Sequence, residues 1–109
     1  MLDLRDKTAI ITGGATGIGF GLAKACGEQG AKVVIGEPRQ ARLDEAVGVL
    51  EAAGVTARAF LLDVTDPEQL ARFTEQAFAA FGEVALVVNN AGIGQARGSV
   101  MDTAFEEMR

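Results

Sequence analysis

The segment from Thr12 to Gly21 is rich in glycine and lies between a short apolar run and a helical pattern. Where a strand turns into a helix, backbone N–H groups and the positive end of the helix dipole together form a site for an anion. Glycine suits such a turn because a Cβ would hold a phosphate group away from the backbone. The spacing Gly13-x-x-x-Gly17-x-Gly19 differs from the dinucleotide-binding G-x-G-x-x-G. A P-loop is excluded, because Phe20 stands where that motif requires lysine.

Glu37 follows Gly19 by eighteen residues and comes directly after the second apolar run. In folds that bind a dinucleotide, an acidic residue about 20 residues after the glycine turn hydrogen-bonds the ribose hydroxyls. Pro38 favours extended backbone at Glu37, which places the carboxylate at the tip of a strand. Each feature alone has a simpler explanation: the turn could only pack a helix against a strand, and Glu37 could be a solvated loop carboxylate. Their combined spacing favours a dinucleotide site.

The composition excludes several other classes of function. The 109 residues carry 10 Lys and Arg against 15 Asp and Glu, and the net charge of −5 opposes non-specific binding to nucleic acid. The sequence has no His, Tyr or Trp, so His-ligated zinc and a Ser-His-Asp triad are excluded, and no metal site is expected. The single cysteine, Cys26, lies in a helical pattern and is expected to be a small buried residue rather than a reactive thiol.

No segment predicts export or a membrane span. The first seven residues alternate in charge and lack the apolar core of a signal peptide. The longest purely aliphatic run, Val84–Val88, is far shorter than the roughly 20 residues that cross a bilayer. We therefore expect a cytoplasmic protein that binds neither membranes nor nucleic acid.

Short apolar runs alternate with amphipathic helical stretches along the chain. Near-continuous apolar runs are typical of strands in a parallel sheet that is covered on both faces. The strands are expected at Thr8–Ile11, Lys32–Ile35, Ala59–Leu62 and Val84–Val88. Right-handed crossovers then predict an α/β fold, an incomplete doubly wound parallel sheet with strand order 3-2-1-4. A last helix is expected to begin near Ser99 or Val100, and residues 1–109 to form a single domain.

Local signals place the ends of the predicted helices. Glycine can adopt the left-handed conformation that ends a helix, and one stands before each later strand: Gly30, Gly54 and Gly82. In the third helix, Asp66 is the expected N-cap, Pro67 the first residue, and Gln69 the residue that completes a capping box. Two apolar stripes are expected to face the core: Leu43, Ala46, Val47 and Leu50 on the second helix, and Leu70, Phe73, Ala77 and Phe81 on the third.

Three motifs are expected at the carboxyl ends of parallel strands. They are Thr12-Gly13-x-x-x-Gly17-Ile18-Gly19, Asp63-Val64 and Asn89-Asn90-Ala91-Gly92. Together they resemble the short-chain dehydrogenase/reductase family, whose N-terminal, cofactor-binding portion is the part that this chain matches. The resemblance implies a Rossmann-type half-domain and an oxidoreductase that moves a hydride between NAD(P) and a small alcohol or carbonyl substrate. It also implies a homo-oligomer.

The resemblance assigns cofactor-binding roles to individual residues. Those that would hold the pyrophosphate and the adjacent ribose are Gly13, Thr16, Gly17, Ile18 and Gly19. Those that would line the wall from the adenosine ribose toward the nicotinamide are Asn90, Ala91 and Gly92. Asp63 would accept a hydrogen bond from the adenine amino group, with the backbone of Val64 beside it. The alternative for Asp63 is a bond to nearby loop N–H groups, and the Asn89 amide is expected to join strands rather than touch a ligand.

Two residues of opposite charge bear on the choice of cofactor. Glu37 would repel a 2′-phosphate and accept from a free 2′-hydroxyl, which favours NAD. Arg39 stands where family members that prefer NADP often carry a basic residue. NAD is the favoured cofactor, because Glu37 is nearer the strand tip, and NADP is the alternative. A further departure from the family pattern is Ala85, where an Asp is common.

No catalytic residue can be assigned. The family uses a Tyr, a Lys four residues later, a Ser and an Asn, whereas this sequence has no Tyr, and Ser99 comes too early. Ser99 is better explained as the N-cap of the last helix. The 109 residues alone are therefore predicted to be inactive and to self-associate through the fourth strand. The alternatives are a non-catalytic nucleotide-binding module or a structural, partner-binding remnant; a methyltransferase is disfavoured by the glycine spacing.

Overall fold

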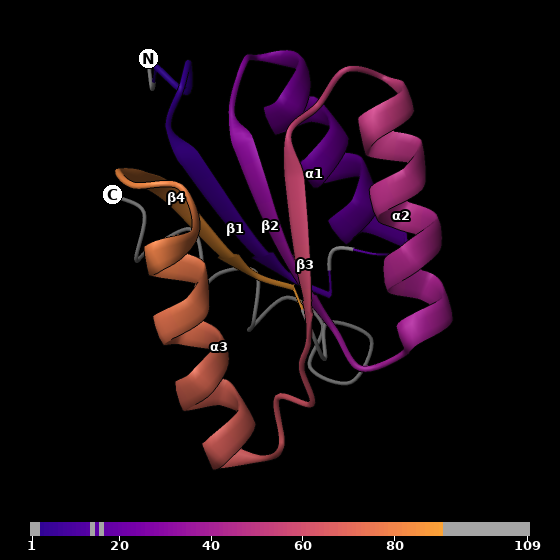
Figure 1. Ribbon diagram of the computed structural model, residues 1–109, viewed down its shortest axis with the longest axis vertical. Coiled ribbons are helices and arrows are strands. Elements are labelled where there is room, and N and C mark those ends of the chain that lie inside the picture. The colour runs from indigo at the N-terminus through magenta and orange to yellow at the C-terminus, as the bar shows by residue number, and fades with distance from the viewer. Residues whose placement is uncertain (1–2, 14, 16, 91–109) are drawn as a thin grey trace.

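The computed structural model describes residues 3–13, 15 and 17–90. The elements are β1 (Thr8–Thr12), α1 (Gly17–Glu28), β2 (Lys32–Glu37), α2 (Gln40–Ala52), β3 (Ala57–Leu61), α3 (Pro67–Ala80) and β4 (Val84–Asn89). The four strands are parallel and lie in the order β3-β2-β1-β4, as predicted (Figure 1). Within this part of the chain, no helix is long and apolar enough to cross a membrane.

Helices cover both faces of the sheet. α1 and α2 pack on one face and α3 on the other (Figure 1). Neighbouring residues of β1 point to opposite faces, so that Ile11 belongs to the cluster under α1 and α2, and Ile10 to the cluster under α3. Both faces are buried, which explains the unbroken apolar runs Ala9–Ile11 in β1 and Val33–Ile35 in β2. The predicted α/β class and doubly wound arrangement are confirmed.

Three of the four strands reach further toward their carboxyl ends than the apolar runs predict. Thr12, Glu37 and Asn89 are the last residues of β1, β2 and β4, because their backbones continue the parallel ladder. The third strand was placed too late: it begins at Ala57, which pairs with Val33, and ends at Leu61. β3 lies at an edge of the sheet and tolerates exposed residues, so its start carries little apolar signal. The predicted last helix lies outside the described residues.

The predicted glycine helix ends are confirmed. The φ angles of Gly30, Gly54 and Gly82 are 90°, 84° and 110°, in the left-handed region. The predicted stripes are correct where the helices meet the sheet: Leu43, Ala46 and Leu50 are buried on α2, and Phe73 and Ala77 on α3. Val47 and Phe81 are only half-buried, and the prediction that Leu70 faces the core is wrong, since it is exposed.

Asp66 caps α3 as predicted, but Gln69 does not complete a capping box. Asp66 Oδ1 accepts from the N–H groups of Glu68 at 3.0 Å and Gln69 at 3.3 Å. The Gln69 side chain instead accepts from the Asp63 N–H at 2.9 Å and donates to Asp66 Oδ2 at 3.3 Å. The Asp66 N–H is already bonded to the Asp63 carbonyl, which removes it as a partner for Gln69. Gln69 therefore fixes the loop after β3.

Cys26 is buried, as expected of a small core residue. It lies on α1 with 6% of its surface exposed and belongs to the core cluster under α1 and α2. Burial raises the pKa of its thiol above the usual value, which disfavours the reactive thiolate.

Candidate functional site

The candidate residues gather at the carboxyl edge of the sheet. β1, β2, β3 and β4 run in the same direction, so that the segments following them leave from one edge (Figure 1). Gly13 follows β1, Glu37 ends β2, Asp63 follows β3, and Asn90 follows β4. Ligands bind at this edge of open α/β sheets, where the connections diverge.

The turn after β1 is built around glycines with positive φ. Gly13 has a φ of 66° and Gly17 a φ of 58°, and the Gly13 N–H donates to the Gly36 carbonyl at 2.7 Å. Gly17, Ile18 and Gly19 are the first residues of α1, whose N–H groups have no carbonyl acceptor within the helix. Ile18 is 59% exposed. The helix start therefore offers N–H donors at the sheet edge.

Gly19 lies where three segments approach closely. A Cβ on Gly19 would overlap the carbonyl oxygen of Gly13 and stand 2.6 Å from Nδ2 of Asn90. Side chains other than hydrogen do not fit there, so the first turn of α1 can touch both segments only because residue 19 is glycine. The glycine spacing thus serves packing as well as an open turn.

Asn90 is held between β1 and the glycine turn. It is 7% exposed, its N–H donates to Thr12 Oγ1 at 3.1 Å, and its Nδ2 donates to the Gly13 carbonyl at 3.3 Å. Its Oδ1 is buried and has no hydrogen-bond partner within the described part of the chain. A buried amide oxygen without a partner is costly, and a ligand donor or water at this edge would satisfy it.

Thr12 is a positioning residue; it belongs to the first motif, but the sequence predicted no role for it. Its hydroxyl is 2.8 Å from Oδ1 of Asn89 and accepts from the Asn90 N–H, which fastens β4 to β1. The prediction that the Asn89 amide joins strands is therefore confirmed. A hydroxyl residue that directly follows the apolar run Ala9–Ile11 is the signal that could have revealed this role.

Thr12→Val is expected to lower the free energy of unfolding by about 2 kcal/mol, because it leaves the buried Asn90 N–H without its acceptor. Thr12→Ser keeps the hydroxyl and loses only a methyl group, at a cost of about 1 kcal/mol. Urea unfolding measures the loss of stability in both variants. Hydrogen exchange at the Asn90 backbone amide distinguishes the two variants, because the exchange rate should rise in Thr12→Val alone. Equal exchange rates in the two variants would contradict this role.

Glu37 is a buried carboxylate with one exposed cationic partner. Its side chain is 2% exposed, and its Oε1 lies 2.7 Å from Nε of Arg39, whose side chain is 57% exposed. The Glu37 carbonyl accepts from the Leu62 N–H at 3.0 Å, which holds this residue in line with the sheet. The alternative of a solvated loop carboxylate is therefore wrong.

Asp63 makes hydrogen bonds within its own loop, which was the alternative to a role in binding the cofactor. Its Oδ1 accepts from the Thr65 hydroxyl at 2.6 Å and from the Thr65 N–H at 2.9 Å. These donors hold the pKa of the exposed Asp63 carboxyl below its usual value, so that it is ionised at neutral pH. A carboxylate has a second oxygen, and the predicted bond to an adenine amino group remains a prediction. Val64 packs its side chain against the core under α3.

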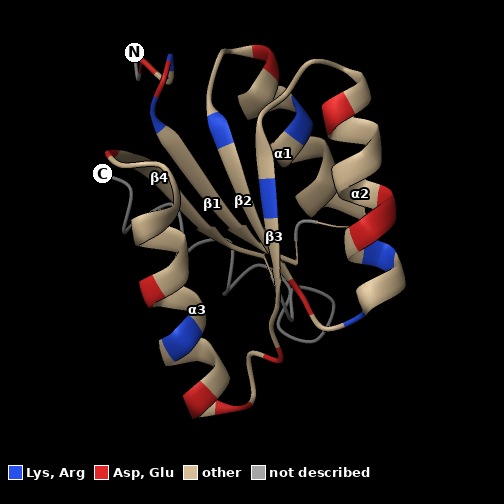
Figure 2. Ribbon diagram, in the orientation of Figure 1, with Lys and Arg blue, Asp and Glu red and all other residues tan. Residues whose placement is uncertain are grey.

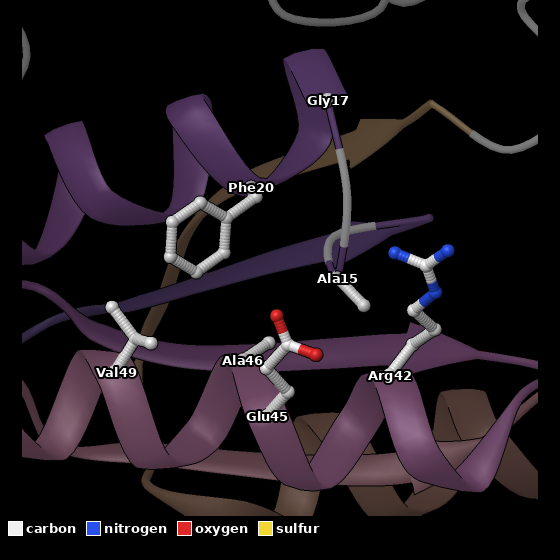
Figure 3. A pocket seen from close by; sticks show the side chains of 7 residues that line it. All are labelled: Ala15, Gly17, Phe20, Arg42, Glu45, Ala46 and Val49. Carbon is white, nitrogen blue, oxygen red and sulfur yellow. The ribbon is translucent and has the colours of Figure 1, made fainter.

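A hollow of about 290 Å³ adjoins the glycine turn on the side of α1 and α2. It is lined by Ala15, Gly17, Phe20, Arg42, Glu45, Ala46 and Val49. In Figure 3, Arg42 and Glu45 extend from α2 into this hollow, across from Phe20 of α1. Among the residues that the structure describes, Gly17 is the one predicted cofactor-binding residue that lines this hollow.

The structure therefore brings Gly13, Gly19 and Asn90 into close approach and pairs Glu37 with Arg39. Acidic and basic residues both occur where β2 leads into α2 (Figure 2). Among residues 3–13, 15 and 17–90, no group of three or more acidic, His or Cys side chains could hold a metal ion. Thr16, Ala91 and Gly92 lie outside the described residues.

Comparison with known proteins finds dehydrogenases whose sequences are similar to this chain. C alpha-dehydrogenase of Sphingobium sp. strain SYK-6 is 37% identical over 107 residues, which are 98% of this chain and 35% of that protein. L-rhamnose 1-dehydrogenase (NADP(+)) of Thermoplasma acidophilum is 39% identical over 94 residues, or 85% of this chain and 37% of that protein. The chain thus spans about a third of the length of these relatives.

A solved structure supports the same relationship. A short chain dehydrogenase/reductase from Burkholderia phymatum, in complex with NAD, matches with a TM-score of 0.75 and 31% identity over 80% of this chain and 31% of that chain. The family model for short chain dehydrogenases matches residues 7–109. The glycine turn at the sheet edge and this match over nearly all of its length make the chain a member of the short-chain dehydrogenase family.

Proposed function

We propose that this chain is the cofactor-binding portion of an NAD(P)-dependent oxidoreductase that acts on alcohols or carbonyls, with residues 1–109 forming one half-domain. The observation that carries the proposal is the close approach of Gly19 to Gly13 and Asn90, which sets the start of α1 against the carboxyl edge of the sheet. Relatives named for NADP(+) or solved with NAD support a dinucleotide as the ligand.

The residues present fit such a cofactor. The start of α1 supplies N–H donors for a pyrophosphate, and Asn90 lies beside it, held by its bonds to Thr12 and Gly13. We assign the pyrophosphate and adjacent ribose to Gly13, Thr16, Gly17, Ile18 and Gly19, the adenine to Asp63 and Val64, and the wall beyond to Asn90, Ala91 and Gly92. The bound nicotinamide would supply the hydride chemistry, and these residues would bind and orient the adenosine half.

We propose NAD rather than NADP as the preferred cofactor. Glu37 ends β2 and is buried, so its carboxylate is fixed where a free ribose hydroxyl could donate to it. A 2′-phosphate beside the same carboxylate would meet charge repulsion. The pairing with Arg39 does not reverse this preference, because the Arg39 side chain is 57% exposed to water whereas the Glu37 carboxylate is buried.

The 109 residues by themselves are proposed to bind cofactor without turnover, since they contain no Tyr and no residue to which acid–base catalysis can be assigned.

We place the protein in the cytoplasm and propose a homo-oligomer. The outer edge of β4 is unpaired within the described sheet, and Val87 on this strand is 44% exposed. Light scattering tests whether the protein forms an oligomer: a monodisperse monomer at high concentration would contradict this proposal.

Calorimetric titration tests the proposed function. ADP-ribose carries the adenosine, pyrophosphate and second ribose, and should bind at micromolar to millimolar concentration. Nicotinamide mononucleotide carries the other half of the dinucleotide and should bind at least tenfold more weakly. Circular dichroism confirms that the protein is folded during the titration. If folded protein gives no heat with millimolar ADP-ribose, or prefers the mononucleotide, the proposal is wrong.

A further inference from the structure

β3 lies at one end of the sheet, and its outer edge is unpaired within the described residues (Figure 1). On its inner side, the Leu62 N–H that follows the strand donates to the Glu37 carbonyl of β2 at 3.0 Å. In a parallel ladder every second residue bonds to the same neighbour, so the backbone of Phe60 also faces β2. The N–H and C=O groups of Ala59 and Leu61 therefore face away from the sheet, where a further strand could pair with them.

A groove of about 350 Å³ lies between α2 and β3. This β3 groove is lined by Gln40, Leu43, Asp44, Val47, Gly48, Glu51 and Ala59. Its α2 residues recur with the spacing of one helix face. Leu43 is buried, and Val47 and Ala59 are half-buried, so these three side chains form an apolar floor. The groove therefore places an apolar surface beside a free strand edge.

The β3 groove carries negative charge that no ion pair balances. Asp44 and Glu51 are exposed, and neither pairs with a Lys or Arg that the structure describes. In this part of the chain Asp44 accepts one hydrogen bond, from the Gln40 amide at 2.9 Å. The two carboxylates stand seven residues apart on α2, roughly 10 Å along the helix axis. Their charge favours a ligand that carries two cations at a similar spacing.

Gly48 is a glycine in the interior of α2 that the packing of the described chain does not require. Apart from its chain neighbours and its own helix backbone, no described atom lies within 4 Å of a Cβ built there. Glycine destabilises a helix relative to alanine, because it loses more backbone freedom on folding. Gly48 lines the β3 groove, so its missing side chain leaves room for another backbone to approach α2.

We propose that the β3 groove binds an extended, basic peptide segment of a partner protein. The segment would pair with the outer edge of β3 and set two Lys or Arg side chains against Asp44 and Glu51. Cations four residues apart on a strand are separated by roughly 13 Å, and their long side chains can adjust to the spacing of the carboxylates. An apolar residue midway between them would lie on the floor near Val47. The β3 groove shares no residue with the proposed cofactor site.

A second copy of this chain fits the β3 groove less well. An antiparallel pair of β3 strands would set α2 of both copies on the same face of the joined sheet, where Asp44 and Glu51 of the two copies repel. β3 also offers no cation on that face, because the Arg58 guanidinium lies 5.3 Å from the Phe81 ring on the α3 side. The partner must therefore supply the positive charge.

A synthetic peptide tests the proposal. The peptide Thr-Lys-Thr-Val-Thr-Lys-Thr with blocked ends should bind the protein with a Kd below about 1 mM by calorimetry. The same peptide with Glu in place of both Lys should bind about tenfold more weakly or not at all. At saturation, hydrogen exchange at the Ala59 and Leu61 amides should slow about tenfold, because they gain acceptors. Exchange at Phe60, whose N–H faces β2, should change less.

Gly48→Gln places a side chain in the groove and should weaken peptide binding about tenfold, although glutamine favours the helix and the urea midpoint should not fall. Gly21→Gln on α1 is the matched control, because a Cβ at that position also meets open space, and peptide affinity should not change. Glu51→Gln should weaken binding about threefold. Glu45→Gln should have no effect, because Glu45 faces the hollow beside α1 (Figure 3).

Three results would overturn the proposal: no binding of the lysine peptide at millimolar concentration, equal binding of the two peptides, or unchanged affinity in Gly48→Gln. Exchange at Ala59 and Leu61 that slows with protein concentration alone would assign the edge to a second copy and overturn it too. Titration with ADP-ribose reports on the proposed function separately, and its affinity should be the same in Gly48→Gln and the unmodified protein.

Discussion

Gly19→Ala is expected to lower the free energy of unfolding by about 3 kcal/mol and to weaken binding of ADP-ribose at least tenfold. The added Cβ would overlap the Gly13 carbonyl oxygen and come within 2.6 Å of Asn90 Nδ2. The Gly13 carbonyl cannot easily move aside, because the N–H of the same residue is bonded to Gly36 at 2.7 Å. Relief therefore requires α1 to move away from the turn, which displaces the helix N-terminus that the proposed pyrophosphate site needs.

Gly21→Ala is the matched control on the same helix. Apart from its chain neighbours and its own helix backbone, no atom of the described residues lies within 4 Å of a Cβ at that position, and alanine in a helix is favoured over glycine by roughly 0.5–1 kcal/mol. This variant should be slightly more stable than the unmodified protein and should bind ADP-ribose equally well. Chemical unfolding and calorimetry measure both quantities. If the two alanine variants were equally stable, α1 would not approach the turn as closely as described.

Phe73→Ala is expected to have the largest effect on stability, a loss of about 3–5 kcal/mol. The ring is 3% exposed and packs on the sheet in the cluster that contains Ile10 and Val34. It also meets the Phe60 ring edge to face, with 6.3 Å between centroids. A Cβ built on Gly36 would lie 2.9 Å from Phe73 Cε1, so this ring lies against the strand residue that precedes Glu37.

Phe78→Ala offers a control on the same helix, because half of the Phe78 surface is exposed (50%). Removing this ring should lower the free energy of unfolding by less than about 1 kcal/mol, because the ring buries little apolar area in the folded protein. Thermal and urea unfolding of both variants give the comparison. A Phe73→Ala protein that unfolds at the same urea concentration as Phe78→Ala would show that α3 does not hold this face of the sheet.

Much of the fold follows from local signals in the sequence. The run Ala9–Ile11 is apolar because β1 is covered on both faces, and right-handed crossovers then leave few strand orders open. Gly54 and Asp66 mark a helix end and a helix start, since the left-handed backbone and the capping carboxylate are local requirements. The start of β3 was missed because an edge strand needs no continuous apolar run.

Only part of the candidate site could be predicted from the sequence. The sequence placed Gly19 at the start of the first helix, and Glu37 and Asn90 at the ends of the second and fourth strands, and a parallel sheet collects such positions at one edge. It left open whether Glu37 was a solvated carboxylate, and only its burial in the folded chain answers that question. The capping role expected of Gln69 failed for a similar reason, since a tertiary bond to the Asp63 N–H holds its side chain.

The sequence by itself determined the element order, the parallel sheet and the position of the glycine turn, because these depend on patterns within a few residues. Only the tertiary structure decided that Asn90 bonds to Thr12 and Gly13, residues 78 and 77 positions away. It also decided that Arg39 binds Glu37 instead of pointing into solvent. Such contacts depend on the packing of whole strands and helices against each other, and no local periodicity records which side chains that packing brings within bonding distance.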